Sequence, residues 1–318
     1  MSKRMVVTGA AGFIGSHVCE ALVARGHDVT GIDCFTDYYD VAQKRANIAA
    51  LSRESRFHLV EESLSETDLQ RLLKNAGVVF HLAAQAGVRR SWGSDFEHYI
   101  EHNIRATQRL LEAMKGTGTR MVYSSSSSVY GETEQLPMRE DHPTQPRSPY
   151  GVTKLAGEAL CLLYGENHGL PVACLRYFTV YGPRQRPDMA FHRFIRATLA
   201  GEPIDVYGNG TQTRDFTFVS DAVAANLAAA DFTGSQTVFN IGGGSRVSLN
   251  TVIDLIGRLC QRAPDARYRE AEKGDVTHTY ADISRASAEL GYAPRVAIEE
   301  GLQREVEWLD ARRRGVGA

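Results

Sequence analysis

Through the first half of the chain, short apolar runs alternate with longer stretches whose apolar positions repeat every three or four residues. The short runs predict buried β-strands, and the longer stretches predict amphipathic α-helices. The predicted strands are 4–9, 28–33, 57–61, 78–83, 120–125 and 172–178. Strands that are apolar along their whole length and separated by helices are typical of a parallel sheet covered on both faces. The pattern therefore predicts an α/β fold with a doubly wound parallel sheet.

After about residue 178 this alternation loosens into loops rich in Gly and Pro. The helices expected in this later part lie near 189–200, 249–262 and 298–313. Two segments, 215–219 and 238–242, still have the pattern of strands, and at least one is expected to return to the main sheet. The chain should therefore form a larger domain interleaved with a smaller C-terminal substrate domain. The expected boundaries are 1–178 plus about 213–242 for the first, and 179–212 with 243–318 for the second.

A glycine-rich turn follows the first predicted strand. Gly9, Gly12 and Gly15 recur in the sequence Gly-Ala-Ala-Gly-Phe-Ile-Gly, with Phe13 and Ile14 between the last two glycines, and an amphipathic helix begins there. Glycines at these positions permit the tight turn, the approach of a pyrophosphate and the packing of helix on strand. The free N–H groups of the helix N-terminus bind phosphate. This arrangement predicts a Rossmann-type dinucleotide-binding domain.

Asp33 ends the second predicted strand, at about the separation from the glycine turn expected for the acidic residue that binds a ribose 2′-hydroxyl. A carboxylate at this position would repel the 2′-phosphate of NADP. We therefore expect NAD as the cofactor, with Asp33 and the glycine turn among the groups that hold it.

The composition narrows the remaining classes of function. The chain has 318 residues and a formal net charge of −2, so it has no basic footprint for nucleic acid. Its five cysteines are scattered without a Cys-x-x-Cys pair, so neither a metal site nor a disulfide framework is expected. No apolar run approaches the ~20 residues needed to cross a membrane, and the first strand begins too early for a signal peptide. We expect a cytoplasmic protein.

Tyr150 and Lys154 are the candidates for acid–base chemistry. Ser148 and Pro149 are favoured at the cap and first position of a helix, so the two side chains, four residues apart, would share one helix face. A fixed positive charge beside a phenol favours the phenolate and lowers the phenol pKa, which would let Tyr150 act as a general base toward an alcohol. A serine run, 124–128, ends the fifth predicted strand, where open α/β sheets place their active sites.

With these features, several motifs give the chain a resemblance, over essentially its full length, to extended short-chain dehydrogenase/reductases of the NAD-dependent nucleotide-sugar epimerase and dehydratase group. The additional motifs are His81-Leu-Ala-Ala84, Asn103, Arg176-Tyr-Phe-Thr-Val-Tyr-Gly-Pro183 and Arg214-Asp-Phe. The resemblance implies that Ser126 orients the sugar hydroxyl and that Tyr150 is the base. It implies that Lys154 lowers the pKa of Tyr150 and holds the nicotinamide ribose.

The same resemblance implies further contacts with the dinucleotide. Ala83 would contact it through the backbone, and Asn103 would stiffen the loop beside it. Relatives often carry Gly-Asp-Ile where this chain has Glu62-Ser63-Leu64, so the usual carboxylate for the adenine amine is missing. Ser63, or a backbone group of the segment that includes Leu64, is expected to take its place.

Reactions of this group begin with oxidation at C4 of the sugar and diverge according to the residues beside the catalytic serine. Resembling 4,6-dehydratases carry Asp-Glu there, and resembling decarboxylases carry a Glu before Val-Tyr-Gly. This chain has Ser127 and Ser128, hydroxyls that cannot serve as proton-transfer groups near neutral pH. The resemblance therefore implies epimerisation at C4, with NAD regenerated in each cycle.

The substrate is expected to be a UDP-sugar. The stretch from Thr179 to Phe191 closely resembles UDP-glucuronate 4-epimerases, as does the segment 87–92. An arginine fork matches the planar carboxylate of a glucuronate, and we assign this contact to Arg186, with Arg184 as the alternative. The other implied substrate contacts are Arg89 near the sugar or phosphates, Ser127, Ser128 and Thr179 at the sugar, Arg214 at the diphosphate and Asp275 at a ribose hydroxyl.

Three other functions remain open from the sequence. They are a UDP-glucose/UDP-galactose 4-epimerase, a nucleotide-sugar dehydrogenase or decarboxylase, and a non-catalytic NAD-binding protein. The presence of Ser126, Tyr150 and Lys154 together argues against the last. The resemblance also implies a homodimer, formed through the predicted helices at 98–114 and 151–167.

Overall fold

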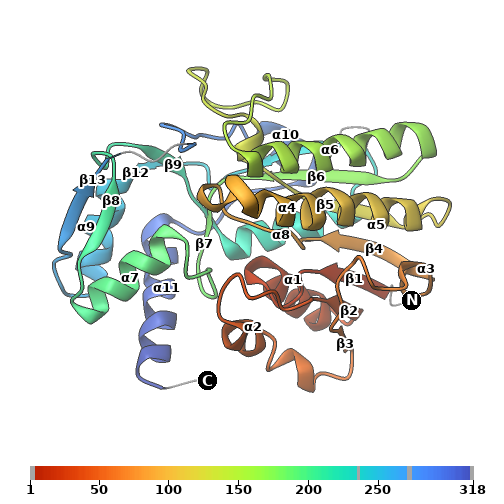
Figure 1. The fold of residues 1–318 in the computed structure, drawn as a ribbon, viewed down its shortest axis with the longest axis horizontal. Helices are drawn as coiled ribbons and strands as arrows, with labels where there is room; N and C mark the ends of the chain where they lie inside the picture. The colour runs from red at the N-terminus through yellow and green to blue at the C-terminus, as the bar shows by residue number, and fades with distance from the viewer. Residues whose placement is uncertain (1–3, 235–236, 271–273, 316–318) are drawn as a thin grey trace.

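A computed structural model describes residues 4–234, 237–270 and 274–315 (Figure 1). Its centre is a seven-stranded parallel sheet in the order β11-β6-β5-β4-β1-β2-β3. The strands are β1 (Arg4–Thr8), β2 (Asp28–Ile32), β3 (Phe57–Val60), β4 (Ala76–His81), β5 (Arg120–Ser126), β6 (Val172–Tyr177) and β11 (Val238–Ile241). The predicted α/β fold with a Rossmann-type doubly wound sheet is confirmed, and the segment at 238–242 returns to the sheet beside β6.

Helices cover both faces of the sheet, because apolar side chains of each strand point alternately to opposite sides. In β1, Met5 and Val7 pack into one layer and Val6 packs into the other. The first layer contains α1 (Phe13–Ala24), α8 (Val219–Asp231) and α10 (Ser284–Leu290). The second contains α3 (Leu69–Leu73), α5 (Ala106–Met114) and α6 (Pro149–His168). Nowhere in the described ranges is a helix both long enough and apolar enough to span a membrane.

A smaller C-terminal lobe lies beside the sheet (Figure 1). Its helices α7 (Ala190–Ala200), α9 (Leu249–Leu259) and α11 (Ile298–Arg313), which match the three helices predicted for this part, enclose a separate apolar cluster. Its short strands pair as β8 (Ile204–Tyr207) with β13 (Ala266–Arg269), β9 (Thr213–Asp215) with β12 (Arg246–Ser248), and β7 (Val180–Tyr181) with β10 (Thr217–Phe218). The remaining α-helices are α2 (Val41–Asn47) and α4 (Phe96–Tyr99), and η4 (Ile100–Arg105) is π-helical. Short 3-10 helices are η1 (Leu51–Arg53), η2 (Arg89–Ser91), η3 (Gly93–Asp95) and η5 (Ser127–Val129).

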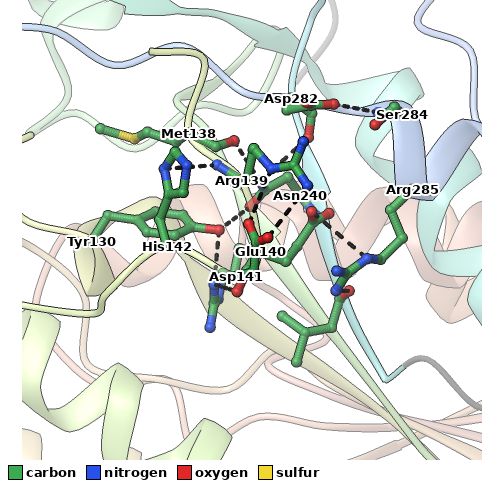
Figure 2. A network of polar contacts seen from close by, with 12 residues as sticks. Tyr130, Met138, Arg139, Glu140, Asp141, His142, Asn240, Asp282, Ser284 and Arg285 are labelled. Carbon is green, nitrogen blue, oxygen red and sulfur yellow. Dashed lines mark hydrogen bonds and ion pairs between the residues drawn. The ribbon is translucent and has the colours of Figure 1, made fainter. Parts of the chain in front are cut away.

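A polar network centred on Asn240 fixes β11 beside distant parts of the chain (Figure 2). The buried Asn240 side chain accepts a hydrogen bond from the Tyr130 hydroxyl (2.7 Å) and donates one to the Met138 carbonyl (2.9 Å). Its backbone N–H donates to Glu140 (2.8 Å), and the Glu140 carboxylate lies 3.8 Å from the Arg285 guanidinium. The segment that follows β5 is thereby joined to β11 and α10.

Candidate active site

The glycine turn lies between β1 and α1, at the point where the strand order reverses between β1 and β4. Gly9 has φ +69°, and a Cβ atom there would lie 2.8 Å from the Ala83 nitrogen. A Cβ atom on Gly15 would lie 2.0 Å from the Gly9 oxygen. Gly12 precedes α1 and makes no side-chain cap, which leaves the first N–H groups of α1 without a side-chain acceptor. The turn therefore has the shape and donors that a pyrophosphate requires.

The Asp33 carboxylate stands directly after β2 and is held by two backbone N–H groups, those of Ala11 (3.0 Å) and Phe35 (2.8 Å). It lines a cavity at the carboxyl edge of the sheet that we call the inner cavity. Of the residues predicted to bind the dinucleotide, the inner cavity is lined by Gly9, Gly12, Phe13, Ile14, Gly15, Asp33, Leu64, Ala83, Tyr150 and Lys154. These residues fit NAD.

Ser63 does not line the inner cavity in the structure, although Glu62 and Leu64 on either side of it do. The Ser63 hydroxyl is hydrogen-bonded to that of Ser65 (2.7 Å). The segment thus offers Leu64, rather than the Ser63 hydroxyl, to a ligand in the cavity.

Tyr150 and Lys154 lie on the first turns of α6, where the local sequence places them. The Ser148 hydroxyl accepts a hydrogen bond from the Gly151 N–H (3.1 Å), so the predicted cap forms and the helix begins at Pro149. Ser126 ends β5 and is hydrogen-bonded to Tyr150. The structure therefore brings Ser126, Tyr150 and Lys154 together from the end of β5 and the start of α6.

The sequence predicted that Lys154 lowers the pKa of the Tyr150 phenol, and in the structure a different cation does so. Burial raises the pKa of the Tyr150 phenol, while the Arg186 guanidinium and the hydrogen bond with Ser126 lower it. Burial also lowers the pKa of Lys154 to about 8, and its ammonium lies 4.5 Å from the centre of the Tyr123 ring. The cation that favours the Tyr150 phenolate in this structure is thus Arg186, which no local spacing could have indicated.

Asn103 lies in the π-helical segment η4, a geometry that is rare and frequent at functional sites. Its amide oxygen accepts from the Gln85 N–H (2.7 Å), and its amide nitrogen donates to the Gln85 carbonyl (3.0 Å) and the Thr153 hydroxyl (2.9 Å). Asn103 therefore joins the loop after β4 to α6, one residue from Lys154.

A second cavity, which we call the outer cavity, lies between the sheet and the C-terminal lobe. It shares Tyr150, Tyr177 and Arg186 with the inner cavity, so the two meet at the candidate base. The predicted substrate residues that line it are Arg89, Ser126, Ser127, Ser128, Thr179, Arg186 and Asp275. A molecule in the outer cavity could therefore present one hydroxyl to Tyr150 beside a dinucleotide in the inner cavity.

The structure separates the roles of Arg184 and Arg186. Arg184 turns toward α1, where its guanidinium contacts Glu20 (2.6 Å) and the Ser16 hydroxyl (3.2 Å). Arg186 lines both cavities, and its Nε and Nη2 atoms each lie 3.0 Å from an oxygen of Asp188. Of the two candidate forks, Arg186 is the one placed to meet a ligand.

Arg89 and Asp275 reach the outer cavity as a pair, with 2.7 Å between their charged atoms, and the Arg89 guanidinium lies 4.3 Å from the centre of the Tyr207 ring. Arg214, which was expected to contact the diphosphate, lies elsewhere in the structure. Its guanidinium donates to the carbonyls of residues 213, 276 and 277, and it does not line the outer cavity. In this structure Arg214 fixes the loop that carries Asp275.

Sequence reasoning missed several residues that line the cavities, among them Tyr38, Asp188 and Arg193. Tyr38 lines both cavities and donates a hydrogen bond to Asp188 (3.4 Å), and Arg193 on α7 lines the outer cavity. Asp188 could have been identified from the sequence because it lies two residues after Arg186. No motif or spacing in the sequence marks Tyr38 or Arg193 as part of the site. Within the described part of the chain, no group of three or more His, Cys, Asp or Glu side chains could hold a metal ion.

Comparison with known proteins shows similarity over nearly the whole chain. A model of the NAD dependent epimerase/dehydratase family matches residues 5–242. An uncharacterized UDP-glucose epimerase of Bacillus subtilis, YtcB, is 45% identical, covering 97% of this chain and 98% of its own. A UDP-glucuronate 4-epimerase of Thermodesulfobacterium geofontis is 38% identical, covering 95% of each. The crystal structure of Bacillus cereus UDP-glucuronic acid 4-epimerase with UDP-glucuronic acid and NAD is 44% identical, with a TM-score of 0.94, covering 97% of this chain and 99% of its own.

Proposed function

Because this chain belongs to the NAD dependent epimerase/dehydratase family, we propose that it interconverts UDP-glucuronate and UDP-galacturonate by epimerisation at C4, with NAD as the cofactor. The observation that carries this assignment is the position of Arg186 at the junction of the two cavities beside Tyr150, where, among the described residues, Asp188 contacts its Nε and Nη2 atoms and the donors of Nη1 remain for a ligand. A uronate differs from a neutral hexose by a carboxylate at C5, and the arginine fork matches that group.

The geometry supports a role for each residue of the site. The Tyr150 phenolate removes the proton of the C4 hydroxyl and returns it after the sugar has turned, while Ser126 orients that hydroxyl. NAD, when bound, accepts the C4 hydride and gives it back to the opposite face. The Asp33 carboxylate is fixed to bind the adenosine ribose, and Lys154 the nicotinamide ribose. Arg89 and Asp275 line the outer cavity, which supports contacts of both with the nucleotide sugar.

The 4-keto intermediate is a β-keto acid, which loses CO₂ once the bond from C5 to the carboxylate lies parallel to the carbonyl π system. An epimerase must therefore restrain the carboxylate while the keto sugar turns. Arg186 and Thr179 line the outer cavity at the point where such a group would lie. The hydroxyls of Ser127 and Ser128 line it too, in place of the acidic groups that would assist elimination.

The direct test is incubation of the purified protein with NAD and UDP-glucuronate in D₂O, followed by separation of the products. UDP-galacturonate without deuterium at C4 or C5 is expected, because the hydride stays in the site and C5 is not deprotonated. UDP-glucose, assayed in parallel, tests the alternative neutral substrate. A pentose product, stoichiometric reduced cofactor, or deuterium at C5 would each contradict the assignment.

Arg186→Lys is expected to weaken the use of UDP-glucuronate. The ammonium keeps the charge but lacks the fork that fixes a planar carboxylate, and losing a charge-assisted hydrogen bond of 1.5–3 kcal/mol corresponds to a fall in kcat/KM of about 10- to 100-fold. A 4-keto-pentose product should appear as well, since the carboxylate is less restrained. Steady-state kinetics with product analysis would show both effects. Turnover of UDP-glucose should change less, and wild-type kinetics without pentose would place the carboxylate contact elsewhere.

We also propose the two domains expected from the sequence. The first, 1–178 plus about 213–242, would hold NAD, and the second, 179–212 with 243–318, would hold the nucleotide sugar. The inner cavity is lined by the first of these domains apart from Arg186, which supports its role in holding NAD, whereas the outer cavity is lined by residues of both domains. Binding of NAD and of UDP, measured separately for Asp33→Ala and Asp275→Ala in the full chain, tests the division, because the first change should weaken mainly NAD and the second mainly UDP.

A homodimer in the cytoplasm completes the proposal. On α6, the apolar side chains of Val152 and Leu163 are about half exposed, at 47% and 52%. All five cysteines are free thiols, as is usual in a reducing compartment. A monomeric mass in light scattering would contradict the dimer, and cell fractionation would check the compartment.

A further inference from the structure

Four arginines line the outer cavity, and three of them face carboxylates. The three pairs are Arg89 with Asp275 (2.7 Å), Arg90 with Asp95 (3.9 Å) and Arg186 with Asp188 (3.0 Å). The fourth is Arg193, which is half-buried on α7. Among residues 4–234, 237–270 and 274–315, no carboxylate or carbonyl lies within hydrogen-bonding or ion-pair distance of the Arg193 guanidinium.

Among the described residues, the acidic side chains that line the outer cavity do not offset this charge. Three aspartates line it, and two of them, Asp188 and Asp275, already pair with arginines of the cavity. The third, Asp205, lies 2.9 Å from the Arg269 guanidinium on the neighbouring strand. In the described part of the chain, the excess positive charge of the cavity is therefore concentrated at Arg193. A partly buried cation without a partner is unfavourable unless an anion binds it.

The position of α7 indicates which anion this is. The helix follows the loop that carries Arg186 and precedes β8, which ends at Tyr207. Its N-cap residue Met189 and its residues Ala190, Arg193 and Phe194 line the outer cavity between these two points of the chain. The first turn of α7 contains no acidic residue that would repel an anion, and the positive end of the helix dipole favours one there.

From this arrangement we infer that Arg193 binds the diphosphate of the nucleotide sugar, the group that joins the sugar beside Arg186 to the nucleoside toward Tyr207. The inference rests on the proposed class of substrate. Arg214, the residue expected at the diphosphate from the sequence, donates instead to three backbone carbonyls and does not line the outer cavity.

The test compares Arg193→Gln with Arg196→Gln in the NAD-loaded protein. Arg196 is a matched control because it lies one turn further along α7, is 62% exposed and contacts Glu202 at 3.5 Å. Calorimetric titration with UDP and with uridine separates binding of the phosphates from binding of the nucleoside. We expect the Kd for UDP to rise about 10- to 100-fold in Arg193→Gln, the loss expected for a charge-assisted hydrogen bond, with little change for uridine. Arg193→Lys should recover part of the affinity.

The outcomes separate this inference from the proposed function. Unchanged UDP affinity in Arg193→Gln, or equal weakening of UDP and uridine, would overturn the diphosphate contact while leaving the proposed reaction intact. Failure of the wild-type protein to bind UDP would overturn both. Thermal unfolding of each variant shows whether α7 has kept its packing. If Arg196→Gln lost as much UDP affinity as Arg193→Gln, the effect would come from the charge of the helix in general, which would overturn the specific contact.

Discussion

Tyr150→Phe is expected to lower kcat by roughly 10²- to 10⁴-fold, the range typical of a lost general base. The ring of Tyr150 lies edge-on to Tyr99, and this packing survives the change because only the hydroxyl is removed. The Phe variant has no group that can take the C4 proton, whereas the contacts proposed for the carboxylate and diphosphate are untouched. Substrate affinity should therefore change much less than turnover.

The pH profile gives an independent reading of this prediction. Burial raises the pKa of the Tyr150 phenol, and the base is active only as the phenolate. Wild-type kcat/KM should consequently rise with increasing pH as the phenol of the free enzyme loses its proton, and the residual activity of the Phe variant should lack that rise. Near-normal turnover in the variant, or an unchanged pH profile, would mean that Tyr150 is not the base. Tyr268→Phe, at an exposed position on β13, serves as the control.

Arg176→Leu is expected to lower the free energy of unfolding by about 3–5 kcal/mol, because it leaves a buried carboxylate without its partner. Arg176 and Glu158 form two contacts, of 2.6 and 3.0 Å, and their side chains are only 6% and 2% exposed. The Ser125 hydroxyl donates to the same carboxylate (2.6 Å). The pair therefore joins β6 and α6 to the end of β5, next to Ser126.

Urea denaturation followed by circular dichroism would measure this effect, and two further variants make it specific. The double variant Arg176→Leu/Glu158→Leu should recover a large part of the stability, since apolar replacement of a whole buried pair is often neutral. Arg105→Leu, which breaks an exposed pair with Glu101, should cost no more than about 1 kcal/mol. A single variant at Arg176 that was no worse than Arg105→Leu would show that the buried pair contributes little.

The elements that sequence predicted well are those whose signals are local. Six strands of the sheet coincide with apolar runs, because a strand buried on both faces must be apolar along its length. The position of the dinucleotide turn could be predicted because neighbouring backbone atoms leave no room for a Cβ atom at positions 9 and 15, so the sequence must have glycine there. Ser148 and Pro149 start α6 by the chemistry of their own side chains, which puts Tyr150 and Lys154 on adjacent turns. The sequence predicted that at least one of the segments 215–219 and 238–242 would return to the sheet, but it did not indicate that β11 would pair with β6.

Tertiary structure decided the contacts of the long charged side chains. The sequence by itself determined the Rossmann-type sheet, the dinucleotide turn and the relative placement of Tyr150 and Lys154, because backbone sterics and helix geometry act over a few residues. It left Arg184 and Arg186 as alternatives, and only the folded chain turns one toward Glu20 and the other into both cavities. It also could not show that Arg214 is held by carbonyls while Arg193 is left without a partner in the described chain. An arginine reaches acceptors several ångströms from its backbone, so its role depends on which distant segments the fold brings within that reach.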